Sequence, residues 1–201
     1  MITAPVHTYR ANRAVDELRI GRRSRRWCGS AAVITVLMVA CAAHRQLPAS
    51  WAGGEVTNYR RLENGLATAN AITLAAVPKL AAAGVRTIID LRTPNESGLR
   101  EEAAAAGQAG IRYVNIPVTP ATLSAADIRE VAGVLDRPEN RPVLMHCSSG
   151  NRTGAVMELY REMIHGVDHD TARREAQTIG LQMPQVIEAV DRVQRQMEST
   201  H

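Results

Sequence analysis

The chain of 201 residues contains no phenylalanine, and aromatic residues make up only 3% of it. Because proteins that bind single-stranded nucleic acid stack the bases on aromatic side chains, this scarcity argues against such a surface. Cysteine is also rare, and Cys28, Cys41 and Cys147 lie in three different contexts, which predict neither a disulfide framework nor a zinc site. A hydrophobic content of 45% still allows a core, built from Ala, Val, Leu, Ile and Met.

A net positive charge is found only in the amino-terminal segment. Residues 1–41 contain seven arginines against Asp16 and Glu17, a net charge of +5, which leaves −1 for the rest of a chain that carries +4 in total. The basic balance therefore belongs to a leader, and no nucleic-acid partner follows from it.

Residues 28–43 form an uncharged run of 16 residues. A membrane-spanning helix needs about 20 apolar residues, so the run fits the apolar region of an export signal better. Its end, MVAC, resembles a bacterial lipobox, in which the cysteine (here Cys41) is lipidated. An uncleaved anchor helix and simple cleavage after Ala43 are the alternatives.

These features predict three regions. Residues 1–43 are expected to be a lipoprotein export signal, residues 44–57 a tether and residues 58–199 the folded domain. The domain is expected on the periplasmic side of a bacterial membrane, anchored there through Cys41.

The domain alternates between short apolar runs and amphipathic stretches. Strands that alternate with helices predict an α/β fold with a parallel central sheet of about four to five strands flanked by helices. The apolar runs that predict strands are 65–68, 86–91, 113–118 and 143–145. The stretches that predict helices are 73–83, 97–107, 124–135, 156–164, 170–179 and 184–197.

The strand at 143–145 leads into the loop HCSSGNRT and then into a helix. Cys147 is expected at the carboxyl end of a buried strand, where open α/β sheets hold their ligands. Free N–H groups at the start of the following helix favour an anion, and they also favour a thiolate. We therefore expect a lowered pKa and raised nucleophilicity for Cys147. A buried cysteine beside a solvated arginine is the structural alternative.

The other loop residues suit the binding of a phosphate-like oxyanion. Gly150 permits the positive φ that turns backbone amides inward, and Arg152 offers a planar fork for two oxygens. Thr153 supplies a hydroxyl that can donate to the sulfur when it becomes a leaving group. We expect Cys147, Arg152 and Thr153 to be catalytic. The rest of the expected phosphate-binding loop is His146, Ser148, Ser149, Gly150 and Asn151.

HCSSGNRTG resembles the signature of the cysteine-dependent phosphatases, His-Cys-x-x-Gly-x-x-Arg-Ser/Thr, with one residue fewer between Cys147 and Arg152. The shorter form resembles the phosphatase-like domain of the beta-lactamase hydrolase-like proteins, which carry His-Cys-x-Ser-Gly-x-Arg. The segments GLATANAIT and AAAGVRTIIDLR also look like that family, and the resemblance covers residues 58–197. It implies a compact dual-specificity-phosphatase-like fold with Cys147 as nucleophile and Arg152 as oxyanion binder.

The loop and the resemblance predict a cysteine-dependent phosphatase of the tyrosine and dual-specificity class. It is expected to hydrolyse a phosphorylated protein or small molecule through a thiophosphoryl-Cys147 intermediate, without a metal or an organic cofactor. The six-residue loop from Cys147 to Arg152 is also similar to that of the rhodanese sulfurtransferases, so an enzyme with a Cys147 persulfide is one alternative. An anion-binding module with little turnover is the other.

The general acid of such an enzyme has no obvious counterpart. Dual-specificity enzymes place an Asp shortly after the strand that corresponds to 113–118, where this chain has Thr119 and Pro120. The next carboxylate, Asp127, follows Ser124 by three residues, the spacing of a capping box. The acid is therefore missing or is supplied from elsewhere.

Asp90 and Arg92, at the end of the 86–91 strand, are candidate supporting residues, with a capped turn and mutual pairing as the alternative. His146 is expected to point away from the Cys147 side chain and to shape the loop, because side chains alternate along a strand. Four potential metal ligands also gather near a helix junction, but capping and solvation account for them and no metal site is expected. They are His165, Asp168, His169 and Asp170.

Overall fold

The computed structural model describes residues 47–199, which form a five-stranded sheet in the order β1-β2-β5-β3-β4. The four parallel strands are β2 (Leu66–Ala69), β5 (Val143–His146), β3 (Thr87–Asp90) and β4 (Arg112–Asn115). A short edge strand that we did not expect, β1 (Arg60–Arg61), pairs antiparallel with β2. The predicted α/β fold is confirmed, and the sheet is mixed rather than wholly parallel.

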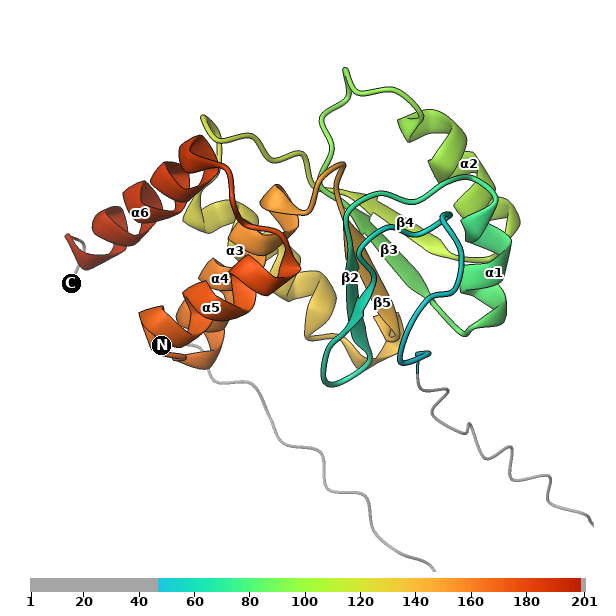
Figure 1. Ribbon diagram of the computed structural model, residues 1–201, viewed down its shortest axis with the longest axis horizontal. Helices are drawn as coiled ribbons and strands as arrows, with labels where there is room; N and C mark the ends of the chain where they lie inside the picture. Colours follow the sequence, from blue (N-terminus) through green and yellow to red (C-terminus); the bar gives the residue numbers. More distant parts are fainter. Residues whose placement is uncertain (1–46, 200–201) are drawn as a thin grey trace, which may run out of the picture. The chain divides into compact units, whose positions relative to one another are not determined.

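Helices cover both faces of this sheet (Figure 1). α1 (Ala76–Ala82) and α2 (Leu99–Gln108) lie on one face, and four helices form a layer on the other. The four are α3 (Ala125–Leu135), α4 (Asn151–His165), α5 (His169–Ile179) and α6 (Pro184–Glu198). A 3-10 helix, η1 (Pro138–Asn140), precedes β5. Every expected helix and strand occurs, with ends that differ by up to three residues, except that α4 begins five residues before the expected 156.

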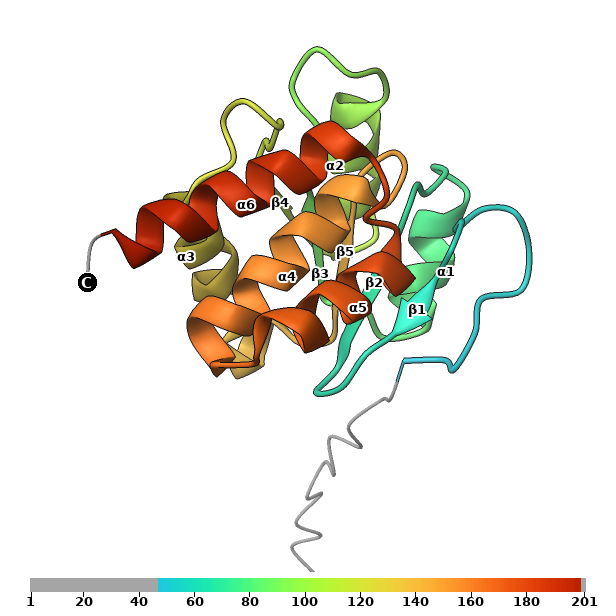
Figure 2. The same ribbon diagram turned by 60° about the vertical axis from the view of Figure 1, so that its left-hand side comes forward.

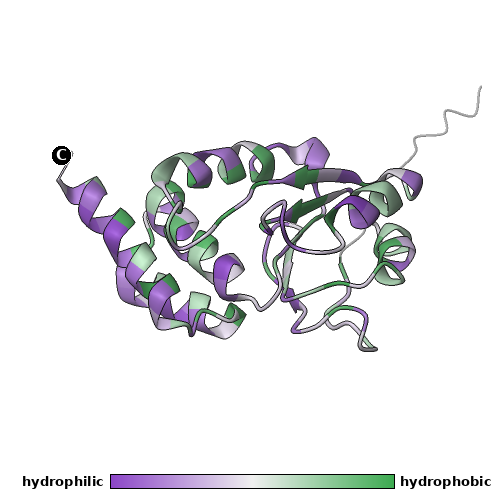
Figure 3. Ribbon diagram, turned by 90° about the horizontal axis from the view of Figure 1, so that it is seen from above, coloured by the Kyte–Doolittle hydropathy of each residue, from purple (hydrophilic) through white to green (hydrophobic). Residues whose placement is uncertain are grey.

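The strand residues divide between two hydrophobic cores. On β5, Val143 and Met145 pack with the four-helix layer, whereas Leu144 packs with α1 and α2. Ile89 and Ile88 of β3 divide in the same way. All five side chains are 0% exposed, which explains why the strands are continuous apolar runs in the sequence. Both hydrophobic and hydrophilic colours appear on the covering helices in Figure 3, as expected for helices buried on one side.

The carboxyl ends of the parallel strands reach the same level of the sheet. Asp90 of β3 is in register with His146 of β5 and with Asn115 of β4, and Ala69 of β2 is also in register with His146. Cys147 follows β5 directly, so the loop after it begins at the edge where parallel sheets hold their ligands.

Residues 47–57, which we interpreted as part of a tether, pack on the domain. Leu47 and Val56 are 2% and 4% exposed, and the Tyr59 hydroxyl donates to the Pro48 carbonyl. The expected export signal, with Cys41, lies outside the described residues. Within residues 47–199, no helix combines the length and the hydropathy needed to cross a bilayer.

Candidate active site

The loop between β5 and α4 wraps around the sulfur of Cys147. Gly150, the residue before α4, has a φ of 85°, and its backbone N–H donates to Cys147 Sγ at 3.1 Å. Cys147 is 0% exposed, and its own N–H donates to the carbonyl of Asn70 at 3.1 Å. The positive φ thus aims the free amides at the start of α4 at the sulfur.

Two opposing effects set the acidity of Cys147. Burial raises the pKa of its thiol, but the neighbouring Thr153 side chain and the backbone amides of Thr153, Ser149 and Gly150 outweigh burial, so the pKa is lowered. The Thr153 hydroxyl is itself buried, and its oxygen has no hydrogen-bond partner within the described residues. A rotation that lets it donate to the thiolate would satisfy both groups.

The lowered pKa of Cys147 predicts that its reactivity persists in mildly acidic solution. An ordinary thiol has a pKa of about 8.5, so alkylation by iodoacetamide should remain fast as the pH falls below that value and decline only when the lower pKa is crossed. Phosphate and vanadate should protect Cys147 by occupying the loop. Modification at Cys147 is measured by peptide mass spectrometry, and an ordinary thiol titration without anion protection would contradict the assignment.

Arg152 is held at the mouth of the loop by Glu96, which lies between β3 and α2. Its two terminal nitrogens donate to the two Glu96 oxygens at 2.6 and 2.8 Å. Ser148 Oγ donates to Glu96 at 2.8 Å and accepts from Arg152 at 2.6 Å. The hydrogen bonds from Arg152, together with those from Thr93 and Ser148, hold the pKa of Glu96 far below its usual range. Glu96 therefore positions the guanidinium as a carboxylate, not as a proton donor.

Sequence reasoning missed Glu96. It lies in the polar loop TPNESG, 56 positions before Arg152, and a glutamate in such a loop gives no periodic signal. The only local hint is that Glu96 follows Thr93 by three residues and accepts the Thr93 N–H at 2.8 Å. That contact closes a turn and so brings the carboxylate round to the catalytic loop.

His146 is buried beneath the loop and anchors it. Its Nδ1 lies 3.1 Å from the Cys147 carbonyl oxygen, and its Nε2 lies 2.8 Å from Glu102 Oε1. Burial lowers the pKa of His146, but Glu102 and Asp90 outweigh it and the pKa is raised. As an imidazolium it donates from both nitrogens, so His146 ties the Cys147 backbone to α2 and adds positive charge behind the thiolate.

Asp90 and Arg92 lie in the same buried network rather than at the mouth of the site. The Arg92 side chain donates to Asp90 at 2.6 Å and to Glu102 at 2.6 Å, and the Tyr113 hydroxyl donates to Asp90. Burial, the largest single effect, raises the pKa of Asp90, but the hydrogen bonds from Arg92 and Tyr113 and the charge of His146 together outweigh it, so the pKa is lowered. Both residues therefore support the loop through Glu102 and His146, and they are paired with each other, as the alternative interpretation expected.

Asn151 fixes the loop from its other side. Its Oδ1 accepts the N–H groups of Gln182 and Met183 at 2.8 and 2.7 Å, and its Nδ2 donates to Ser149 Oγ at 3.2 Å. The connection between α5 and α6 is thereby bound to the first residue of α4. The loop backbone is held rigidly, as a site for a transition state requires.

The position of the expected acid contains no carboxylate. Thr119 forms a turn with Thr122 through reciprocal backbone and side-chain hydrogen bonds of 3.0–3.1 Å. Asp127 accepts the Ser124 N–H at 2.9 Å in a capping box, so the prediction that Asp127 caps α3 is confirmed. Among the described residues, only Glu96 and Glu102 are carboxylates that hydrogen-bond to the side chains of the loop.

The four potential metal ligands near the helix junction take different roles. Asp168 accepts the Thr171 N–H at 3.0 Å and caps α5, as expected. The ring of His165 packs edge-on against Tyr160. Only His169 approaches other ligand-type side chains, namely Glu158 and Glu162 of α4.

With this geometry established, the chain can be compared with known proteins. A family model described as "DSP-PTPase phosphatase fused to NAD+ Kinase" matches residues 44–193. The chain belongs to this family. The beta-lactamase hydrolase-like protein of Agrobacterium fabrum is 36% identical over 96 residues, which are 46% of this chain and 22% of that protein. The resemblance predicted from the loop is thus confirmed.

The dual specificity protein phosphatase TpbA of Pseudomonas aeruginosa is 37% identical over 82 residues, 40% of this chain and 38% of that protein. The chain spans well under half the length of these curated relatives. A crystal structure of TpbA matches with a TM-score of 0.56 at 27% identity and covers 67% of this chain and 84% of that one. Another, of TpbA in complex with phosphotyrosine, has the same TM-score and identity and covers 66% and 82%.

The family, the structural match and the loop agree on the chemistry. The family match and the fold place the chain with the dual-specificity-type phosphatases, as predicted, and its loop carries the cysteine and the arginine of a cysteine-dependent phosphatase. Nothing in the comparisons favours the sulfurtransferase alternative.

Proposed function

We propose that this phosphatase acts on aryl phosphomonoesters, with phosphotyrosine as the representative substrate. The observation that carries the proposal is that Arg152 holds Glu96, the carboxylate at the mouth of the loop, as an anion. No other carboxylate of the described residues hydrogen-bonds to the open side of the loop. An aryloxide is a good leaving group and needs no proton donor, whereas an alkoxide does. The complex of TpbA with phosphotyrosine supports the same substrate class.

The proposed reaction begins when the Cys147 thiolate attacks phosphorus in line with the departing aryloxide. A bond forms between Sγ and phosphorus, and the bond from phosphorus to the ester oxygen breaks. The amides of Ser149 and Gly150 and the guanidinium of Arg152 stabilise the charge on the equatorial oxygens. Water then attacks the thiophosphoryl group and releases phosphate, and the Thr153 hydroxyl donates to the departing sulfur.

A comparison of substrates tests this proposal. p-Nitrophenyl phosphate should be hydrolysed far faster than an alkyl phosphate such as glycerol phosphate, because only the first leaves without protonation. The measurement is phosphate release, with Cys147→Ser as the blank. Sulfur transfer from thiosulfate to cyanide well above that blank, without phosphate release, would instead establish a sulfurtransferase. Vanadate binding without either activity would leave an anion-binding module.

We also propose that the domain is exported and held at the periplasmic side of a membrane by a lipid on Cys41. The support is the sequence alone: the uncharged run 28–43 closes on MVAC behind seven arginines.

Replacement of Cys41 by serine is expected to move the chain out of the membrane fraction or to block its processing, because serine offers no thiol for the lipid. Fractionation followed by intact-mass measurement distinguishes these results. Unchanged membrane attachment at unchanged mass would point to an uncleaved helix, and a soluble wild-type chain would contradict the anchor.

A further inference from the structure

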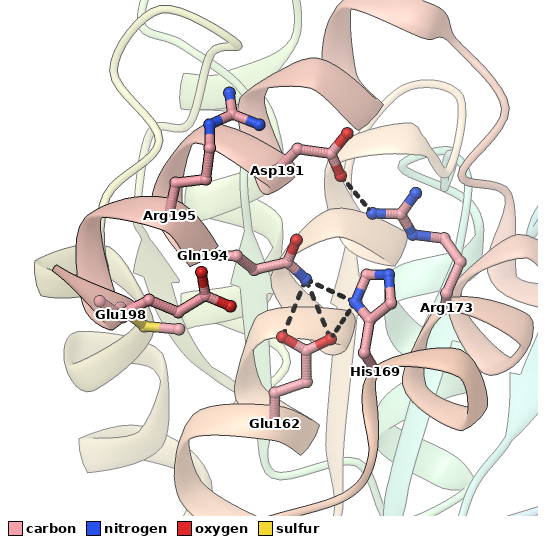
Figure 4. A pocket seen from close by; sticks show the side chains of 8 residues that line it. Glu162, His169, Arg173, Asp191, Gln194, Arg195 and Glu198 are labelled. Carbon is pink, nitrogen blue, oxygen red and sulfur yellow. Dashed lines mark hydrogen bonds and ion pairs between the residues drawn. The ribbon is translucent and has the colours of Figure 1, made fainter. Parts of the chain in front are cut away.

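α4, α5 and α6 lie side by side in Figure 2. Residues of these three helices line an open pocket of about 420 Å³, and none of the lining residues belongs to the catalytic loop. Glu162 lies on its floor, ten residues after Arg152 on the same helix, which at 1.5 Å per residue is about 15 Å along α4. Figure 4 shows Glu162, His169 and Gln194 pointing toward one another from the three helices. The phosphatase mechanism uses none of these side chains.

The amide nitrogen of Gln194 is surrounded by more acceptors than it can serve. It lies 3.0 and 2.9 Å from the two oxygens of Glu162, 3.0 Å from His169 Nδ1 and 3.3 Å from Glu158 Oε1. An amide carries two hydrogens, so at least two of these four atoms receive no proton from it. His169 Nδ1 is also 3.1 Å from Glu162 Oε1, and it cannot both donate there and accept from Gln194.

Glu158 gives an independent sign of a ligand. Its side chain is 0% exposed, and its Oε2 has no hydrogen-bond partner within the described residues. The same carboxylate borders the cluster, because its other oxygen, Oε1, lies 4.0 Å from His169 Nδ1. Arg173 donates to that same oxygen at 2.7 Å, but Asp191 shares its guanidinium at 2.6 Å. A buried carboxylate with one orphaned oxygen is costly unless another cation compensates it.

The charges around the pocket have the sign that a cation needs. Three carboxylates line it, those of Glu162, Asp191 and Glu198, against the guanidinium groups of Arg173 and Arg195, and the buried carboxyl group of Glu158 lies beside them. Acidic groups therefore outnumber basic ones around the pocket, which favours a cation over an anion.

We propose that Glu158, Glu162 and His169 form a binding site for a divalent transition-metal ion, with zinc the best match. Each of the three offers one ligand atom, and these atoms lie within 4.8 Å of one another. Zinc bonds of about 2.0–2.2 Å to imidazole nitrogen and carboxylate oxygen place such atoms roughly 3–4 Å apart, so small side-chain rotations close the site around an ion. The mixed nitrogen and oxygen set excludes calcium and magnesium as preferred occupants.

The site has an entry path and a structural consequence. His169 is half exposed, so an ion reaches the carboxylates from solvent through the imidazole side of the pocket. The ion takes the position now held by the Gln194 amide, whose carbonyl oxygen can turn to become a fourth ligand. Because the ligands come from α4 and α5, with Gln194 on α6, the ion ties together the helix layer behind the catalytic loop.

Cobalt(II) binding to the full-length chain, stripped of metal by chelation and carrying Cys147→Ser, tests the proposal. Cobalt follows the same ligand preferences, and its visible spectrum reports them. One equivalent should bind with weak visible bands and without the strong near-ultraviolet band of a cobalt–thiolate bond, and zinc should displace it. His169→Ala and Glu162→Gln should each weaken binding at least tenfold. Both side chains are at or near the surface, so both variants are expected to fold, which circular dichroism confirms.

Glu130→Gln is the matched control, since Glu130 is an exposed glutamate on α3 outside this pocket, and the variant should bind like its parent. Equal affinity in all variants, no binding at all, or a thiolate spectrum that persists in His169→Ala would each overturn the proposal. None of these readouts depends on phosphatase activity, so they test the metal site independently of the proposed substrate class.

Discussion

Replacing Arg152 by lysine is expected to lower kcat/KM for p-nitrophenyl phosphate by about a hundred- to a thousandfold, the loss typical of an oxyanion-stabilising donor. The guanidinium meets Glu96 through two nitrogens and Ser148 through one of them. Lysine keeps the charge, but its ammonium cannot pair with both Glu96 oxygens and present a planar fork to a phosphoryl group at the same time. Steady-state kinetics on the purified chain measure the loss.

Two further variants are compared with Arg152→Lys. Arg129→Lys, on the exposed face of α3, should leave kcat/KM unchanged and controls for the substitution itself. Glu96→Gln should reduce activity less than Arg152→Lys, because it loosens the guanidinium without removing it. A loss below tenfold for Arg152→Lys, or an equal loss in Arg129→Lys, would show that Arg152 does not bind the transferring group.

Gly150→Ala is expected to destabilise the fold by roughly 2–5 kcal/mol and to abolish most activity. A φ of 85° costs a residue with a Cβ about 1–2 kcal/mol. The added Cβ would also collide with Asn70 Oδ1 and come within 2.8 Å of the Ile179 carbonyl oxygen, and such overpacking costs about 1–3 kcal/mol. Relief of the clash would move the N–H that donates to Cys147. Urea unfolding and phosphate release measure the two effects.

The chain offers a matched control in Gly110→Ala. Gly110 has a similar φ of 72°, but a Cβ there would meet nothing within 4 Å. The variant should lose only the stability that the positive φ costs a residue with a Cβ, about 1–2 kcal/mol, and it should keep its activity. If Gly150→Ala and Gly110→Ala were equally stable and equally active, the close packing behind the loop would have no functional role.

The order of strands and helices and the nucleophile could be predicted from the sequence because both depend on local patterns. Four continuous apolar runs alternate with amphipathic stretches, and a strand buried on both faces must be such a run. Cys147 between a strand and a helix, with Gly150 and Arg152 close by, is equally local. The antiparallel edge strand β1 was not predicted, because two exposed arginines carry no apolar signal.

The position of Asp127 in a capping box was also a local matter, since Ser124 and Asp127 lie in one turn. The residues that surround the catalytic loop could not be predicted from local patterns. Glu96 reaches Arg152 across 56 positions, and Glu102 reaches His146 across 44, so nothing in their own neighbourhoods marks them. Such contacts depend on how α2 and the loop before it pack against the sheet.

The sequence by itself therefore determined the fold class, the nucleophile and the chemistry of its loop, because hydrophobic periodicity and the order of loop residues act over a few positions. Only the tertiary structure decided the state of the carboxylates. It made Glu96 an ionised partner of Arg152, put Asp90 in a buried network with Arg92, and gathered Glu158 with His169 from two helices. The charge on a carboxylate depends on burial and on its partners, and both are fixed by contacts between distant segments.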